Sequence, residues 1–186
     1  MRKIYIMLTK SETILSKIVH LITKDEYTHV SIAFEDSMHV FYSSSRKNGR
    51  TLFPAGPCRE HLFIGYFNRH PNIPCTVYEL EVENDVYEKA KEEVDRIMNK
   101  DHEFHFNIIG LLLCRLNISY DRQYNFFCSQ FVGEILHRSK AVRLPKKSSL
   151  MRPVDYMKLP GISCYFSGTV MDFSNKHRPL WFSEAS

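Results

Sequence analysis

Short apolar runs alternate along this chain with longer segments whose apolar residues recur at helical spacing. The runs KIYIML (3–8), THVSIAF (28–34) and MHVFYSS (38–44) are rich in the β-branched and aromatic residues that favour strands. The segment EDS separates the last two runs, which predicts that they pair antiparallel through a three-residue turn. Further strands are predicted at HLFIGYF (61–67), TVYELEVE (76–83) and ISCYFSG (162–168).

Helical spacing predicts several helices around these strands. A capping-box pattern at 9–12 precedes apolar residues spaced three and four apart up to Ile22, which predicts a helix of about three turns. Asn84 or Asp85 is expected to cap an amphipathic helix over VYEKAKEEVDRIMNK. Other helical segments are predicted from about Phe106 to Leu116, from Cys128 to about Ser139, and from the proline of RPVDYMKLPG.

Together these elements predict an α+β fold, an antiparallel β-sheet of about five to six strands packed with helices. At 186 residues, with no linker-like stretch, the chain is expected to form a single domain over residues 1–175. Residues 176–186 are expected to form a C-terminal tail that docks through Trp181 and Phe182 or stays loose.

Composition argues against several function classes. The net charge is +4 and the basic residues form no stripe with interleaved aromatics, so no nucleic acid is expected as a partner. The most apolar run, IIGLLLCRL (108–116), is far shorter than the roughly 20 residues that span a bilayer, so no integral membrane segment is expected. The apolar run near Met1 is also shorter than a signal-peptide core, which predicts a cytoplasmic location.

The five cysteines, at 58, 75, 114, 128 and 164, form neither a CxxC pair nor a disulfide framework. An odd and scattered set is typical of a reducing compartment. His102, His105 and Cys114 could be combined into a zinc site, but such spacing is common by chance. Neither a metal nor another cofactor is therefore expected.

Cys128 lies where the aromatic run YNFF becomes the amphipathic helix CSQFVGEILHRS. A thiol at a helix start is close to the positive end of the helix dipole and to unpaired backbone N–H groups. That environment lowers a thiol pKa and offers an oxyanion site, although a cysteine there is more often structural. Cys128 is expected at the leading edge of the helix, where it need not be part of the buried stripe of Phe131, Val132, Ile135 and Leu136.

A nucleophilic thiol needs a base, and His29 is the best placed of the nine histidines. It opens a predicted strand, and its same-face neighbours, Ser31 and Ala33, are small enough to leave room above the imidazole. A strand-end histidine bonded to a backbone carbonyl is the competing interpretation.

The two motifs together resemble the permuted branch of the NlpC-type papain-like cysteine hydrolases, which includes YiiX-like and lecithin:retinol acyltransferase-like proteins. His-Val-Ser-Ile at 29–32 is similar to the histidine strand of that branch, and Cys-Ser-x-Phe-Val at 128–132 is similar to its nucleophile helix. The segment Arg152–Asp155 resembles one that borders the substrate cleft. The resemblance implies a circularly permuted papain-like fold with Cys128 and His29 as catalytic residues.

The resemblance also implies a polar residue that orients the histidine. A three-residue turn would pair residues whose numbers sum to about 72, so that Ser43 lies opposite His29, or Ser44 for a shorter turn. Glu60 is a third candidate if the loop 45–60 folds back over the sheet. His39 fits poorly, because this register places it more than roughly 10 Å along the strand from His29.

Tyr124, Tyr42 and Ser129 are candidates for the oxyanion site or the cleft, as is Tyr120. With ten tyrosines in the chain, a structural role is the competing interpretation for each tyrosine.

The predicted function is cysteine-dependent hydrolysis of a peptide or isopeptide amide through an acyl-enzyme. The alternatives are a lipid acyl hydrolase or acyltransferase and a non-catalytic binding module that retains the fold. A redox sensor that pairs Cys128 with Cys114 or Cys164 is a further alternative. The expected partner is a peptide-like or acyl substrate, and the sequence leaves the oligomeric state open.

Overall fold

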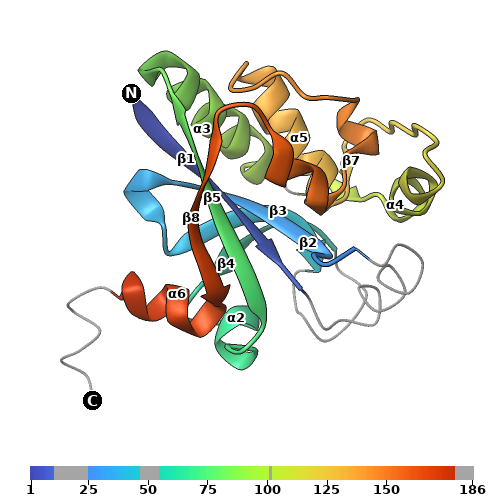
Figure 1. Cartoon of the computed structure of the whole chain (residues 1–186). Coiled ribbons are helices and arrows are strands. Elements are labelled where there is room, and N and C mark those ends of the chain that lie inside the picture. The colour runs from blue at the N-terminus through green and yellow to red at the C-terminus, as the bar shows by residue number, and fades with distance from the viewer. Residues whose placement is uncertain (11–24, 47–54, 101, 179–186) are drawn as a thin grey trace.

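The computed structural model describes residues 1–10, 25–46, 55–100 and 102–178 (Figure 1). Its centre is a six-stranded antiparallel sheet with strand order β4-β3-β2-β1-β5-β8. The strands are β1 (Arg2–Thr9), β2 (His29–Phe34), β3 (Val40–Arg46), β4 (Ala55–His61), β5 (Pro74–Val82) and β8 (Ile162–Thr169). The predicted α+β class, with an antiparallel sheet and packed helices, is confirmed.

Helices cover both faces of this sheet. The α-helices are α2 (Tyr66–Arg69), α3 (Asn84–Met98), α4 (Ile108–Arg115), α5 (Cys128–Arg138) and α6 (Val170–Lys176). The 3-10 turns are η1 (Glu35–Ser37), η2 (Ser148–Leu150) and η3 (Pro153–Lys158). Two short strands, β6 (His105–Phe106) and β7 (Asn125–Phe126), pair in parallel beside the sheet.

Strand β1 shows why the central runs are continuously apolar. Its side chains alternate, so that Ile4, Ile6 and Leu8 pack with α3 and α5, whereas Tyr5 and Met7 pack toward α2 and α6. Figure 1 shows these two helical layers on opposite sides of the sheet. Because both faces are covered, a central strand such as β1 buries most of its side chains and loses the polar alternation of a half-exposed strand.

The prediction of a strand at 61–67 is wrong. Strand β4 occupies Ala55–His61, and the chain then turns into α2. Gly65 has a φ of 74°, a left-handed conformation that glycine adopts without strain, and it ends the extended chain before α2. The sequence AGPCREH does not show a strand pattern because β4 is an edge strand, where proline and charged residues are tolerated.

The cap of one helix differs from the prediction, and another helix was not predicted. Helix α3 begins at Asn84 with Glu83 in the cap position, which has no side-chain capping bond. Helix α6 starts within the region that the sequence pattern left without an element, and its cap is Thr169, whose hydroxyl accepts from the Asp172 N–H at 3.2 Å. The helix predicted up to Ile22 and the tail contacts of Trp181 and Phe182 lie outside the described residues.

Candidate active site

Helix α5 presents Cys128 as its first residue, after Phe127 in extended conformation. The Phe131 N–H is the first that bonds within the helix, to the Phe127 carbonyl at 2.9 Å. The N–H groups of Cys128, Ser129 and Gln130 therefore have no acceptor one turn back along the helix. Such groups at a helix N-terminus can stabilise an anion.

The apolar stripe of α5 anchors this end of the helix against the sheet. Its four members, Phe131, Val132, Ile135 and Leu136, are fully buried. Cys128 is the first residue of α5, at the leading edge that the sequence predicted, and it is 7% exposed within the same core cluster. The thiol is buried because α5 packs its first turn, as well as its stripe, against β2 and β3.

His29 is the first residue of β2, at the point where β2 separates from β3. Pairing with β1 continues to Thr9–His29, whereas Ile32–Tyr42 is the residue pair that joins β2 to β3 among the described residues. The Val30 carbonyl accepts from the Ser43 hydroxyl at 2.9 Å, and the Val30 N–H interacts with the Cys128 thiol. The separation of the two strands thus lets the start of α5 approach His29.

The Cys128 thiol and the His29 imidazole form a mutually stabilising pair. Burial alone would raise the pKa of Cys128, but hydrogen bonding and charge from His29, the Val30 N–H and the charge of Arg115 outweigh it and lower the pKa. Burial likewise acts to lower the pKa of His29, but the charge of Glu60 and the bond to Cys128 outweigh it and raise the pKa well above its usual value. The arrangement favours a thiolate beside an imidazolium.

Glu60 is the residue that the structure joins to His29. The imidazole Nε2 lies 2.9 Å from Glu60 Oε1 and 3.1 Å from Oε2, and both side chains are more than four-fifths buried. Because Nε2 faces the carboxylate, Nδ1 is the nitrogen left for the Cys128 thiol. Glu60 lies in strand β4 rather than in a loop folded over the sheet, and its contact with His29 crosses β3.

The other orienting candidates have different partners. The hydroxyl of Ser43 donates to the Val30 carbonyl, and that of Ser44 donates to the Phe126 carbonyl at 2.7 Å. The register also differs from the prediction, since Ile32 pairs with Tyr42 and the numbers of paired residues therefore sum to 74 rather than 72. The turn is two residues longer than expected because Met38 and His39 belong to it, which excludes His39 from β3.

Three of the four oxyanion and cleft candidates make contacts of other kinds. Ser129 donates to the Met151 carbonyl at 2.6 Å, and the Ser129 carbonyl accepts from the Tyr156 hydroxyl at 2.5 Å. The Tyr42 ring packs near Phe34, with a centroid separation of 6.3 Å. Tyr124 has a φ of 60°, is 42% exposed and places its ring edge against Phe104. These contacts give Ser129 a structural role in holding the first turn of α5.

Arg115 is a residue that sequence analysis did not single out. Its side chain is 3% exposed and its Nη1 lies 3.1 Å from Asp25 Oδ2. Its charge contributes to the lowered pKa of Cys128. The available signal was a lone cation inside the apolar helix IIGLLLCRL, since a buried charge requires a partner and influences its surroundings strongly.

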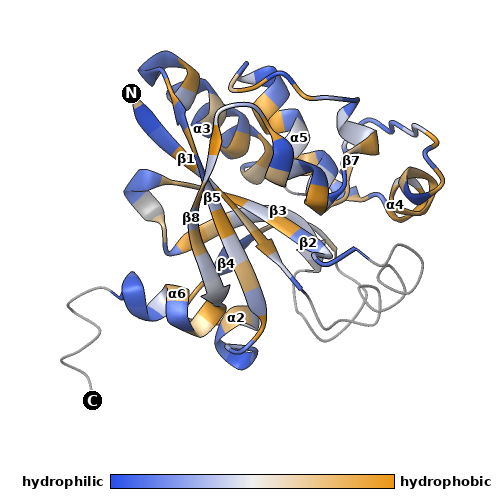
Figure 2. Ribbon diagram, in the orientation of Figure 1, coloured by the Kyte–Doolittle hydropathy of each residue, from blue (hydrophilic) through white to orange (hydrophobic). Residues whose placement is uncertain are grey.

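The outer face of α4 is apolar and exposed, although its inner face packs on the residue next to Cys128. Leu111 and Cys114 form a buried cluster with Phe127. Six of the nine exposed large apolar side chains in the described part of the chain lie between 108 and 124. They are Ile108, Ile109, Leu112, Leu116, Ile118 and Tyr124, and Figure 2 shows the helix as an apolar segment at the edge of the molecule.

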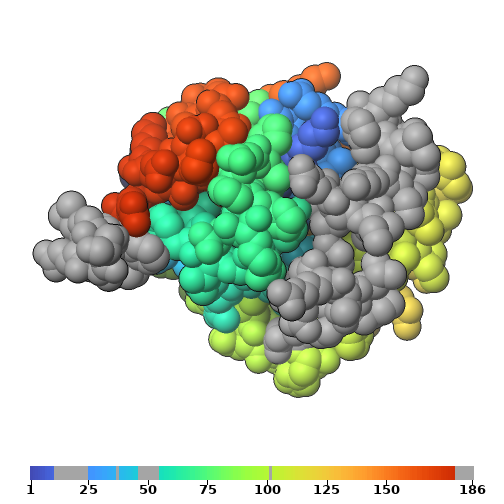
Figure 3. Space-filling model, turned by 90° about the horizontal axis from the view of Figure 1, so that it is seen from below, coloured from blue at the N-terminus to red at the C-terminus, as the bar shows by residue number. Residues whose placement is uncertain are grey.

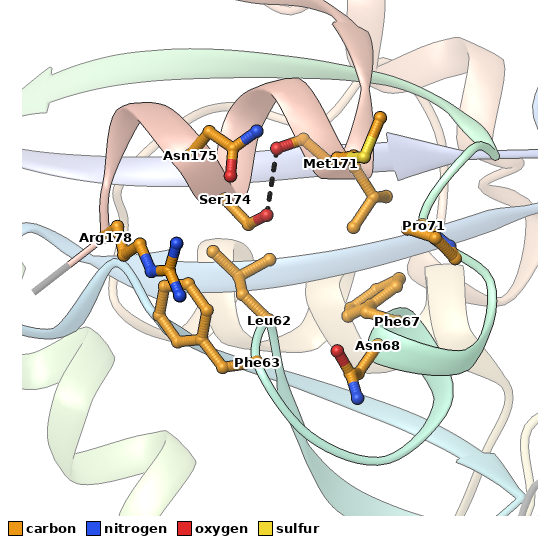
Figure 4. Close-up of a pocket in the computed structure, with 10 residues that line it drawn as sticks. Leu62, Phe63, Phe67, Asn68, Pro71, Met171, Ser174, Asn175 and Arg178 are labelled. Carbon is orange, nitrogen blue, oxygen red and sulfur yellow. Dashed lines mark hydrogen bonds between the residues drawn. The ribbon is translucent and has the colours of Figure 1, made fainter. Parts of the chain in front are cut away.

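A cavity of about 290 Å³ lies away from this site, between α2 and α6 (Figure 4). Its apolar walls include Leu62, Phe67 and Met171, and polar groups of Asn68 and Arg178 lie at its rim. Figure 3 views the molecule from this side, with α6 in red beside the green segment that contains α2. The cavity is on the opposite face of the sheet from α5, so it is no part of the Cys128 site.

Within the described ranges, no group of three or more histidine, cysteine or acidic side chains is placed to hold a metal ion. Among the same residues, no helix combines the length and apolar character needed to cross a bilayer. The side chains of the candidate site are Cys128, His29 and Glu60, contributed by α5, β2 and β4. Neither the protein-family models nor the curated proteins include a match to this chain.

Proposed function

We propose that this protein is a cysteine-dependent hydrolase in which Cys128 is the nucleophile and His29 the general base and acid. Glu60 is the orienting residue for His29. The observation that carries the proposal is the contact series Glu60–His29–Cys128, formed by residues from β4, β2 and the start of α5. The resemblance of the two sequence motifs to the permuted papain-like hydrolases supports the same assignment.

The reaction starts from the thiolate that His29 stabilises. The Cys128 sulfur attacks a substrate carbonyl carbon, and the carbonyl oxygen takes the negative charge beside the free N–H groups of α5. The carbon–nitrogen bond of the amide then breaks, and His29 gives its proton to the leaving amine. The product of this half is a thioester on Cys128.

The second half-reaction regenerates the thiolate beside the imidazolium. Neutral His29 takes a proton from water as the oxygen attacks the thioester carbonyl, and the carbon–sulfur bond breaks to release the acid. Glu60 holds Nε2 of the ring throughout, so that Nδ1 faces the sulfur and the water in turn. Its negative charge stabilises the imidazolium more than a serine hydroxyl would.

An amide of a peptide or isopeptide is the substrate class that the resemblance favours. The first experiment measures iodoacetamide labelling of each cysteine across pH, read by peptide mass spectrometry. We expect Cys128 to label faster than the exposed Cys164 near neutral pH, and to lose this advantage in His29→Ala. Labelling of Cys128 no faster than that of Cys164, and unaffected by His29→Ala, would refute the enzyme assignment and favour the non-catalytic binding module.

A lipid acyl ester is a second candidate substrate, and the exposed face of α4 favours it. Aliphatic side chains that lie in water are stabilised when they enter an apolar phase such as a bilayer surface. The nearby carboxylate of Asp121 accepts from Gln130 and Ser149, whereas Arg122 is exposed and suits an anionic surface. Because the inner face of α4 packs on Phe127, a bilayer bound here would lie close to the element that carries Cys128. Activity-based probes with peptide and acyl-ester warheads separate the two substrate classes.

A further inference from the structure

Strand β3 lies between His29 and Glu60, and it passes them as a run of three serines. Ser44 faces the layer that contains α3 and α5, where its hydroxyl donates to the Phe126 carbonyl. Ser43 and Ser45 lie on the opposite face of the strand from Ser44, and in the pairing with β4 they are opposite Cys58 and Gly56. Small side chains at these positions leave room for a carboxylate and an imidazole to meet across the strand.

Ser45 is the serine that contacts the carboxylate. Its hydroxyl donates to Glu60 Oε1 at 3.0 Å, and the same oxygen lies 2.9 Å from His29 Nε2. An ionised carboxylate is an acceptor, so the proton of this hydrogen bond comes from the serine. Oε1 therefore receives two donors from two different strands, which fixes the rotation of the carboxylate.

Cys58 fixes Ser45 from the other side. Its sulfur lies 3.0 Å from the Ser45 oxygen. Since the single serine proton is given to Glu60, the thiol proton of Cys58 points to the serine oxygen. The donors run in one direction, from Cys58 through Ser45 to the carboxylate, and His29 donates to the same carboxylate.

We infer that Ser45 is a positioning residue for the Cys128 site, acting through Glu60. This inference rests on the proposed function, and it adds a fourth side chain to the proposed machinery. The hydroxyl holds the Glu60 oxygen where it meets Nε2, which keeps Nδ1 aimed at the thiol and stabilises the imidazolium. Loss of this donor leaves the carboxylate free to turn toward water and weakens its hold on His29.

The test compares Ser45→Ala, Ser45→Thr and the matched control Ser44→Ala, each folded as judged by thermal melting. The measurement is the pH dependence of Cys128 labelling, resolved by peptide. We expect Ser45→Ala to shift the Cys128 titration to higher pH and to slow labelling by about three- to tenfold at pH values below the wild-type midpoint, the value of one hydrogen bond. Ser45→Thr restores the hydroxyl and the wild-type profile, and Ser44→Ala leaves the profile unchanged.

A double-mutant cycle with Glu60→Gln isolates the route through the carboxylate. If Ser45 acts through Glu60, adding Ser45→Ala to Glu60→Gln has little further effect on labelling. An unchanged profile in Ser45→Ala, or an equal loss in both backgrounds, would overturn the positioning role. Wild-type Cys128 that is reactive and depends on His29 and Glu60 but not on Ser45 would refute this inference alone, whereas an unreactive wild-type thiol would refute the proposed function.

Discussion

Glu60 accepts from Nε2 of His29 at 2.9 Å, although 31 residues separate them in sequence and a strand lies between them in the sheet. The contact gives the imidazole a defined orientation, with one nitrogen held by a carboxylate and the other facing Cys128. An uncertain orienting residue was the best support for a non-catalytic binding module, and the contact between Glu60 and His29 supplies a candidate for that role.

Glu60→Gln is expected to weaken the Cys128 site without removing it. The amide oxygen can still accept from Nε2 but supplies no negative charge, so the imidazolium loses stabilisation and the pKa of Cys128 rises. A rise of about one pKa unit lowers the thiolate fraction about tenfold below both values. The measurement is the labelling rate of Cys128 across pH, compared at pH values below the wild-type midpoint. Glu79→Gln, at a strand glutamate paired with Lys3, is the matched control and should label as the wild type.

The activity should depend on pH through the paired groups. The pKa of Cys128 is lowered, so the thiolate is lost as pH falls through this value. The pKa of His29 is raised, so the imidazolium is lost as pH rises through that value. Hydrolysis, which needs both forms, should follow a bell whose two limbs belong to the coupled pair. A rate that rises only near the pKa of a free thiol, about 8.5, would contradict the pairing.

Substitutions on α5 should separate packing from chemistry. Phe131→Ala leaves a cavity in a fully buried site and is expected to cost about 2–5 kcal/mol in the free energy of unfolding. Cys128→Ser should cost much less, because a near-isosteric hydroxyl can still bond to His29 and the Val30 N–H. The measurement is denaturant unfolding of both variants. Equal losses would mean that Cys128 serves mainly as a core residue.

The exposed face of α4 makes the lipid alternative testable. Leu112→Glu combined with Leu116→Glu places charge on two side chains that are 45% and 68% exposed. If this face binds bilayers, the double variant should lose co-sedimentation with anionic vesicles while its melting temperature changes little. Met171→Glu, at a 43% exposed position on α6, is the control. Absence of wild-type binding to vesicles would remove the support that α4 gives to a lipid substrate.

Local pattern determined much of the fold. Continuous apolar runs identified β1, β2 and β5, and helical spacing identified α3, α4 and α5, because these elements bury a face that periodicity reports directly. Strand β4 was missed because an edge strand needs no apolar pattern, and α6 was missed because two turns carry little periodic signal. The motifs around His29 and Cys128 were also local, since each lies at the start of a single element.

The orienting residue could not be chosen from the sequence, because it depends on how three strands align. A turn two residues longer than expected changed the register between β2 and β3, and a strand at 55–61 replaced a presumed loop. The sequence by itself determined most of the elements, and it identified His29 and Cys128 as candidates for the base and the nucleophile. The tertiary structure decided that Glu60 rather than Ser43 or Ser44 meets His29. It also decided that the charge of Arg115 lowers the pKa of Cys128 and that Ser45 contacts the Glu60 carboxylate. These contacts join residues far apart in the chain, and no local periodicity records them.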